Sequence, residues 1–189
     1  IAIEERGIPG YTLMSRAGEA AFELLRQRWP DARRMVVICG GGNNGGDGYV
    51  VARLARLAGL EARVLTLADP NNLRGDARTA WRDAQAASVP IAPFAAAEIS
   101  GAELLVDAIL GTGLERDVSG AWREAIDTIN AHPADRFALD IPSGLHADTG
   151  AILGVAVRAA ATITFIGLKQ GLFTGQGPAC SGTVHFAGL

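Results

Sequence analysis

Residues 40–48 form a glycine-rich stretch whose polar side chains could bind a hydroxylated ligand or a cation. The polar members are Asn43, Asn44 and Asp47. Glycine lets the backbone approach a ligand closely, and amide and carboxylate oxygens suit hydroxyl groups or a hard cation. From Gly40 onward the stretch also satisfies G-x-G-x-x-G, a dinucleotide-binding motif. However, Asp47 would repel a pyrophosphate bound in the usual way, and its structural alternative is to cap the next helix.

A second set of residues that could do chemistry lies within an apolar run and in the turn that follows it. Asp107 is inside the run, and Gly111, Thr112 and Gly113 follow it. An unpaired charge in an apolar strand is costly, so Asp107 needs a partner, for which a cation is one candidate. The successive backbone N–H groups of the glycine turn could form a nest for a phosphate. The alternative is a plain turn in which a salt bridge satisfies Asp107.

A third set of candidate residues begins with Asp140, which ends another apolar run and is followed by Ile-Pro-Ser-Gly. A carboxyl group at the end of a strand can be both positioned and partly desolvated. Desolvation raises a carboxyl pKa and suits it to acid–base catalysis. Ser143 adds a hydroxyl oxygen nearby. The alternative is a turn-forming or helix-capping Asp-Pro-Ser cluster.

Alternating strand and helix patterns predict how these three loops are positioned. The expected strands cover residues 35–39, 62–67, 104–110, 137–141, 161–166 and 183–186, and the expected helices cover 13–25, 47–57, 74–86 and 121–129. This order predicts an α/β fold, a three-layer αβα sandwich around a Rossmann-like, mostly parallel sheet. Residues 1–189 are expected to form a single domain. Because parallel sheets bind ligands beyond the carboxyl ends of their strands, the three loops should converge.

Composition and charge exclude several classes of partner. The net charge is −3 without a basic cluster, which argues against nucleic acid. The longest apolar runs are far shorter than the roughly 20 residues of a membrane helix, so no membrane partner is expected. The two cysteines, Cys39 and Cys180, lie in apolar segments and are expected to be buried, reduced thiols. We therefore predict a cytoplasmic protein.

Taken together, these motifs resemble the NAD(P)H-hydrate epimerase family, the amino-terminal domain of the bacterial bifunctional NAD(P)H-hydrate repair enzyme. The combination of the double-asparagine loop and the Asp-Ile-Pro-Ser-Gly loop is highly specific. The matching stretches span nearly the whole chain and are Leu13–Gly18, Gly42–Tyr49, Asp107 with Gly111–Leu114, Asp140–Gly144, and Thr162–Phe165 with Lys169.

The resemblance implies a nucleotide-binding isomerase that interconverts the (R) and (S) epimers at C6 of hydrated NADH or NADPH, a metabolite-repair activity. The hydrate is a substrate rather than a cofactor. The resemblance also implies one potassium ion per subunit, bound by Asn44, Asp107 and Ser143. The residues implied to contact the hydrated dinucleotide are Asn43, Asn44, Gly45, Gly46, Asp47, Gly111, Thr112, Gly113, Leu114, Glu115, Arg116, Asp117 and Asp140.

The chemistry of the hydrate leads to a catalytic assignment. Protonation of the C6 hydroxyl lets it leave as water, because the ring nitrogen stabilises the resulting cation. Water that returns to the other face inverts the carbon, and reversible ring opening is an alternative route. Either route needs a group that acts as both acid and base. We expect Asp140 to be that catalytic group, with Lys169, the only lysine of the chain, positioning the ring or a phosphate.

Two other functions stay open at the level of the sequence. An NAD-dependent dehydrogenase would use the glycine motif, with Asp69 on the ribose hydroxyls. Asp47 and the asparagine pair argue against it. A non-catalytic dinucleotide- or protein-binding module of the same fold would have no need for both the expected metal ligands and the acid–base residue.

The resemblance also implies partners. In bacterial relatives an ADP- or ATP-dependent dehydratase often follows this domain, so the chain could be the amino-terminal part of a longer bifunctional protein. A fused or separate dehydratase is therefore an expected partner, beside the dinucleotide substrate. We also expect a homo-oligomer, a dimer or higher.

Overall fold

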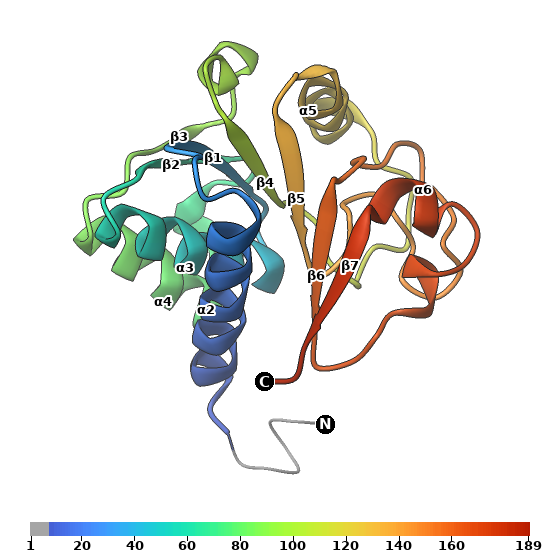
Figure 1. The fold of residues 1–189 in the computed structure, drawn as a ribbon, viewed down its shortest axis with the longest axis horizontal. Helices are drawn as coiled ribbons and strands as arrows, with labels where there is room; N and C mark the ends of the chain where they lie inside the picture. Colours follow the sequence, from blue (N-terminus) through green and yellow to red (C-terminus); the bar gives the residue numbers. More distant parts are fainter. Residues whose placement is uncertain (1–7) are drawn as a thin grey trace.

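Seven strands form one parallel sheet in the computed structural model, which describes residues 8–189 (Figure 1). The order across the sheet is β3-β2-β1-β4-β5-β6-β7, and every neighbouring pair is parallel. The strands are β1 (Arg34–Cys39), β2 (Glu61–Thr66), β3 (Ile91–Pro93), β4 (Leu104–Ala108), β5 (Asp135–Leu139), β6 (Ala161–Phe165) and β7 (Thr183–Ala187). The predicted mostly parallel sheet is confirmed.

Helices cover both faces of this sheet. They are α2 (Gly10–Arg28), α3 (Asn43–Leu57), α4 (Gly75–Ala86), α5 (Gly120–Ala131) and α6 (Gly177–Ser181), with short 3-10 turns η1 (Pro70–Asn72), η2 (Ala96–Ile99) and η3 (Gln170–Leu172). Helices α2, α3 and α4 pack on one face, and α5 packs on the other (Figure 1). The predicted three-layer sandwich is therefore confirmed. Within residues 8–189, no helix is both long and apolar enough to cross a membrane.

Side-chain alternation along the buried strands explains the two apolar layers. In β1, Met35, Val37 and Cys39 pack toward α2, α3 and α4, whereas Val36 and Ile38 pack toward α5. Successive side chains of a strand point to opposite faces, so a strand covered on both sides is apolar throughout. This is why a continuous apolar run predicted each central strand correctly.

Both cysteines are free and buried, as predicted. Burial raises the pKa of the Cys39 thiol and of the Cys180 thiol, which keeps them protonated. Neither sulfur is therefore available as a thiolate nucleophile.

The predicted boundary of α3 was wrong, because the helix begins at Asn43 rather than at residue 47. Glycine is a poor helix former, and the pattern therefore favoured a loop. Tertiary packing overrides that preference. A Cβ atom at Gly45 would lie 2.2 Å from the carbonyl oxygen of Gly40, and one at Gly48 would lie 2.6 Å from the Cβ of Ala108. The glycines thus let the first turns of α3 lie directly on β1 and β4.

Besides the three 3-10 turns, strand β3 and helix α6 were not predicted. Strand β3 is only three residues long and ends in Pro93, and it lies at the edge of the sheet, where proline is tolerated. Helix α6 has only five residues and precedes β7. Neither element contains enough residues to show a periodic apolar pattern.

Candidate active site

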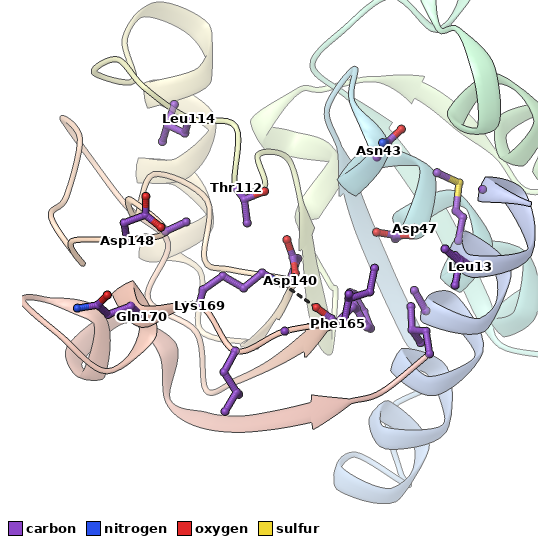
Figure 2. Close-up of a pocket in the computed structure, with 18 of the residues that line it drawn as sticks. Leu13, Asn43, Asp47, Thr112, Leu114, Asp140, Asp148, Phe165, Lys169 and Gln170 are labelled. Carbon is purple, nitrogen blue, oxygen red and sulfur yellow. Dashed lines mark hydrogen bonds and ion pairs between the residues drawn. The ribbon is translucent and has the colours of Figure 1, made fainter. Parts of the chain in front are cut away.

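A cavity of about 720 Å³ lies beyond the carboxyl ends of the central strands (Figure 2). Its volume is typical of small-molecule sites, and its position is where open parallel sheets bind ligands. One wall is apolar and comes from α2, which contributes Leu13, Met14 and Ala17. The opposite wall follows β6 and runs from Phe165 to Gln170.

Asp107 lies at the end of β4 and is held by the loop that follows β5. Its Oδ1 accepts the hydroxyl of Ser143 at 2.6 Å and the N–H of Ile109 at 3.2 Å, and its Oδ2 accepts the N–H of Ser143 at 2.8 Å. Burial raises the pKa of Asp107 to about 6, although the bonds from Ser143 and Ile109 oppose that rise. No cationic side chain within residues 8–189 pairs with Asp107. The salt-bridge alternative is therefore wrong.

Asn44 joins the same network from the first turn of α3. Its amide nitrogen donates to the carbonyl oxygen of Leu110 at 3.0 Å, and the hydroxyl of Ser143 accepts the N–H of Leu110 at 2.8 Å. A carbonyl oxygen can only accept a hydrogen bond, so the NH₂ group of the Asn44 amide, and not its oxygen, must face Leu110. The amide oxygen of Asn44 then points away, and it is buried without a hydrogen-bond partner. Three strand ends thus meet at a buried oxygen-rich cluster, as the sequence predicted.

Asp140 and Lys169 form an ion pair at the cavity. The ammonium of Lys169 donates to Oδ1 of Asp140 and, at 2.8 Å, to the carbonyl of Phe165. The hydroxyl of Thr164 lies 3.5 Å from the same carboxylate oxygen. The side chains of Asp140 and Lys169 are only 17% and 16% exposed. The hydrogen bond from a charged ammonium to a carboxylate is stronger than a neutral one, so Lys169 fixes the position of the Asp140 side chain.

The backbone turns sharply directly after both β5 and β6. Asp140 has a φ of 65° and Ile166 a φ of 66°. In each turn the N–H of the next residue bonds the carbonyl of the preceding one, at 2.8 Å after β5 and 2.6 Å after β6. This left-handed conformation costs free energy, most of all for a β-branched residue, and strain of this kind clusters at functional sites. The turns direct Asp140 and the segment after Phe165 into the cavity.

Asp47 extends from α3 toward Asp140 (Figure 2). It lies inside the helix, whose N-cap is Gly42, so the helix-capping alternative for Asp47 is wrong. Burial raises the pKa of Asp47 well above its ordinary value, and the nearby Asp140 carboxylate raises it further. The Lys169 ammonium opposes this shift. Asp47 and Asp140 therefore present carboxyl groups in different settings to the cavity, one paired with an ammonium and one desolvated.

Replacing Asp47 by asparagine is expected to stabilise the fold at neutral and alkaline pH. The folded state raises the pKa of Asp47, so it binds that proton more tightly than the unfolded chain does, and stability falls as pH rises above about 4. Asparagine does not titrate. The melting temperature of Asp47→Asn should exceed that of the parent by a few degrees at pH 8, and the difference should shrink toward about pH 4. A difference in melting temperature that does not change with pH would contradict the conclusion that burial raises the pKa of Asp47.

Six of the expected dinucleotide-binding residues line the cavity together with Lys169. They are Asn43, Asp47, Thr112, Leu114, Glu115 and Asp140. The remaining expected contacts are not part of the lining. Asn44 belongs to the buried cluster, Gly45 and Gly46 pack α3 against its neighbours, and Gly111, Gly113, Arg116 and Asp117 lie in the loop after β4.

Several lining residues were not expected from the sequence. They include the apolar side chains of α2, as well as Asp76, His146, Asp148 and Gln170. No local motif marks them, because they reach the cavity only through the packing of α2 and the course of the loops. Asp69, which the dehydrogenase alternative places on a ribose, instead caps η1 and does not line the cavity.

Residues 10–171 match the family described as YjeF-related protein N-terminus. This chain belongs to that family. The match covers most of the chain, including the loops after β1, β4, β5 and β6 that line the cavity. The resemblance inferred from the sequence motifs is therefore confirmed.

Curated proteins and a solved structure are also similar to this chain. The bifunctional NAD(P)H-hydrate repair enzyme Nnr of Escherichia coli (strain K12) is 46% identical over 100% of this chain, which spans 36% of that enzyme. The NAD(P)H-hydrate epimerase of Levilactobacillus brevis is 43% identical over 97% of this chain and 85% of its own length. The crystal structure of the yeast protein ynu0 superposes with a TM-score of 0.80 at 18% identity, covering 99% of this chain and 82% of that one. The yeast structure shows the shared fold.

Proposed function

We propose that this YjeF-related domain is an NAD(P)H-hydrate epimerase, which interconverts the (R) and (S) forms of hydrated NADH and NADPH at C6. The observation that carries the proposal is the cavity in which the Asp140–Lys169 pair lies at the carboxyl edge of the sheet. The relatives named epimerase and repair enzyme support it over the dehydrogenase and binding-module alternatives. The reaction is an isomerisation without net redox change.

Asp140 is the acid–base group of this reaction. Its carboxyl group enters the cavity at the end of β5, where the left-handed turn fixes its direction. Such positioning is the main requirement for proton transfer to or from a bound hydroxyl. Lys169 holds the carboxylate through the ion pair and adds positive charge beside the substrate. The apolar wall on α2 offers a surface for the ring.

A potassium ion bound by Asn44, Asp107 and Ser143 completes the proposed site. The buried amide oxygen of Asn44 accepts no hydrogen bond, and a cation would satisfy it. The Asp107 carboxylate accepts three hydrogen bonds and retains acceptor capacity. Amide, carboxylate and hydroxyl oxygens are the ligands that hard cations prefer. When bound, the ion supplies fixed positive charge beside the cavity and balances the buried carboxylate.

The proposed activity is tested with separated (R)- and (S)-hydrates of NADH and NADPH. The protein is expected to convert each pure epimer into the same equilibrium mixture, faster than the spontaneous reaction, as followed by liquid chromatography. Nicotinamide absorbance should stay constant in the presence of oxidisable substrates, because no hydride moves. Steady absorbance change with no epimer conversion would instead favour the dehydrogenase.

Potassium is expected to raise the melting temperature of this protein. A ligand that binds only the folded state stabilises it by RT ln(1 + [L]/Kd), about 2.7 kcal/mol at 100 times Kd. The melting temperature should therefore increase with KCl relative to tetramethylammonium chloride at equal ionic strength. Asn44→Ala should abolish the difference, whereas the surface variant Asp127→Ala should retain it. Equal melting curves in the two salts would remove potassium from the proposal.

The wider cellular setting follows from the bifunctional relatives. This chain spans 36% of the Escherichia coli enzyme, which is named as bifunctional. We infer that a dehydratase, fused or separate, acts on the epimer that this domain supplies. Cytoplasmic location and homo-oligomer formation also stay predictions.

A further inference from the structure

Inversion at C6 by water loss needs proton transfer on both faces of the ring, which a single acid–base group does not provide. In the water-loss route, the hydroxyl leaves from one face of the ring and water returns to the opposite face. A carboxyl group on one wall of a cavity reaches only one of these faces within hydrogen-bond distance. A ring bound between two walls of the cavity would present one face to each wall, so this route calls for a second proton-transfer group opposite Asp140.

Asp47 is placed to be that group. Both Asp47 and Asp140 line the cavity, and Figure 2 shows Asp47 entering it from α3 and facing Asp140 at the end of β5. The two carboxyl groups come from different layers, because α3 covers the sheet and Asp140 lies beyond its edge. Asp47 caps no helix and forms no ion pair within residues 8–189. Nothing in its local structure requires a carboxyl group there.

We propose that Asp47 is a second catalytic acid–base residue of the epimerase, serving the ring face opposite the one served by Asp140. This inference rests on the proposed function and adds a residue to its mechanism. Each carboxyl group protonates the hydroxyl that leaves from its own face of the ring and, in the reverse reaction, deprotonates the water that adds to that same face.

The proton and electron balance of one inversion is complete. Neutral Asp47 gives its proton to the C6 hydroxyl, the C–O bond breaks with its electron pair on the departing water, and the ring nitrogen forms a C=N bond. A second water attacks C6 from the other face, and its electrons return the C=N pair to nitrogen. That water passes a proton to the Asp140 carboxylate. The reverse reaction uses neutral Asp140 and ionised Asp47, and solvent returns the proton between turnovers.

The surroundings of the two carboxyl groups support this division. Lys169 forms an ion pair with Asp140, whereas no cationic side chain within residues 8–189 forms one with Asp47. The groups that act electrostatically on Asp47 are the Asp140 carboxylate and the Lys169 ammonium, while burial disfavours its charge. Two carboxyl groups whose environments differ in this way are typical of acid–base partners.

Oxygen-18 exchange separates this inference from a one-acid mechanism. Each pure hydrate is incubated in ¹⁸O-labelled water with the parent protein, Asp47→Asn, Asp140→Asn or the exposed control Asp127→Asn. Chromatography separates the epimers, and mass spectrometry measures the label in each. The parent and Asp127→Asn should label both epimers as they interconvert. Asp47→Asn should lose epimerisation at least about 100-fold yet still label the epimer whose hydroxyl faces Asp140. Asp140→Asn should label only the other epimer.

The outcomes distinguish the inference from the function on which it rests. Equal labelling of the two epimers by Asp47→Asn, at whatever rate, overturns the face-specific role of Asp47. Should Asp47→Asn not fold, Asp140→Asn decides alone, because labelling of one epimer supports Asp47 and no labelling overturns it. Parent turnover without label also overturns the inference but leaves an epimerase that opens the ring. A parent protein that neither epimerises nor exchanges removes both proposals.

Discussion

Asp140→Asn is expected to lower the rate of epimerisation by about 10²–10⁴-fold, the usual contribution of a positioned acid–base group. Asparagine keeps the shape of the side chain and can still accept a hydrogen bond from Lys169, but it takes up no proton. The loss should therefore appear in kcat, with little change in KM. The measurement follows separated hydrates by chromatography, with the spontaneous rate subtracted.

Two controls make the Asp140 result specific. The melting temperature of Asp140→Asn should stay close to that of the parent, because its side chain lies at the cavity rather than in the core. Asp127→Asn, on the exposed side of α5 with 58% of its side chain accessible, should retain full activity. Turnover by Asp140→Asn within a factor of three of the parent would exclude Asp140 from proton transfer.

Asp107→Ala is expected to reduce the free energy of unfolding by about 2–4 kcal/mol. The substitution leaves three donors without a partner, namely the N–H and hydroxyl of Ser143 and the N–H of Ile109. An unpaired buried donor costs about 1–3 kcal/mol, and relief from burying a charged group offsets part of the sum. For a domain of this size, each kcal/mol lowers the melting temperature by roughly 2–4 °C.

Urea unfolding of Asp107→Ala measures this loss directly. Asp127→Ala is the matched control, since a surface aspartate in an exposed ion pair should change stability by no more than about 0.5 kcal/mol. A loss from Asp107→Ala as small as that of the control would mean that Asp107 does not organise the loops after β4 and β5. Asp107→Ala should also remove the stabilisation by potassium.

Much of the fold could be predicted from the sequence because its cause is local. Continuous apolar runs marked the central strands, since strands covered on both faces bury every side chain, and 3.6-residue periodicity marked α2, α4 and α5. The resulting alternation requires parallel strands. Parallel strands in turn bring their carboxyl ends to one edge, so the convergence of Asn44, Asp107 and Ser143 could be expected before the structure.

The start of α3 and the pairing of the buried polar groups were decided by tertiary structure. Helical propensity disfavours the glycine and asparagine residues that open α3, but close contact with β1 and β4 compensates. Asp107 could have bound a lysine, an arginine or a cation, and only the register of β4 and β5 brings Ser143 to it. The ion pair of Asp140 with Lys169 likewise depends on the turns after β5 and β6.

The sequence by itself determined the αβα architecture, the family and the strand ends that carry polar residues. Tertiary structure alone decided that α2 forms the apolar wall and that Asp47 faces Asp140 across the cavity. The physical reason is the range of the interactions. Periodicity and burial are encoded in neighbouring residues, whereas the approach of two carboxyl groups depends on packing between elements far apart in the chain.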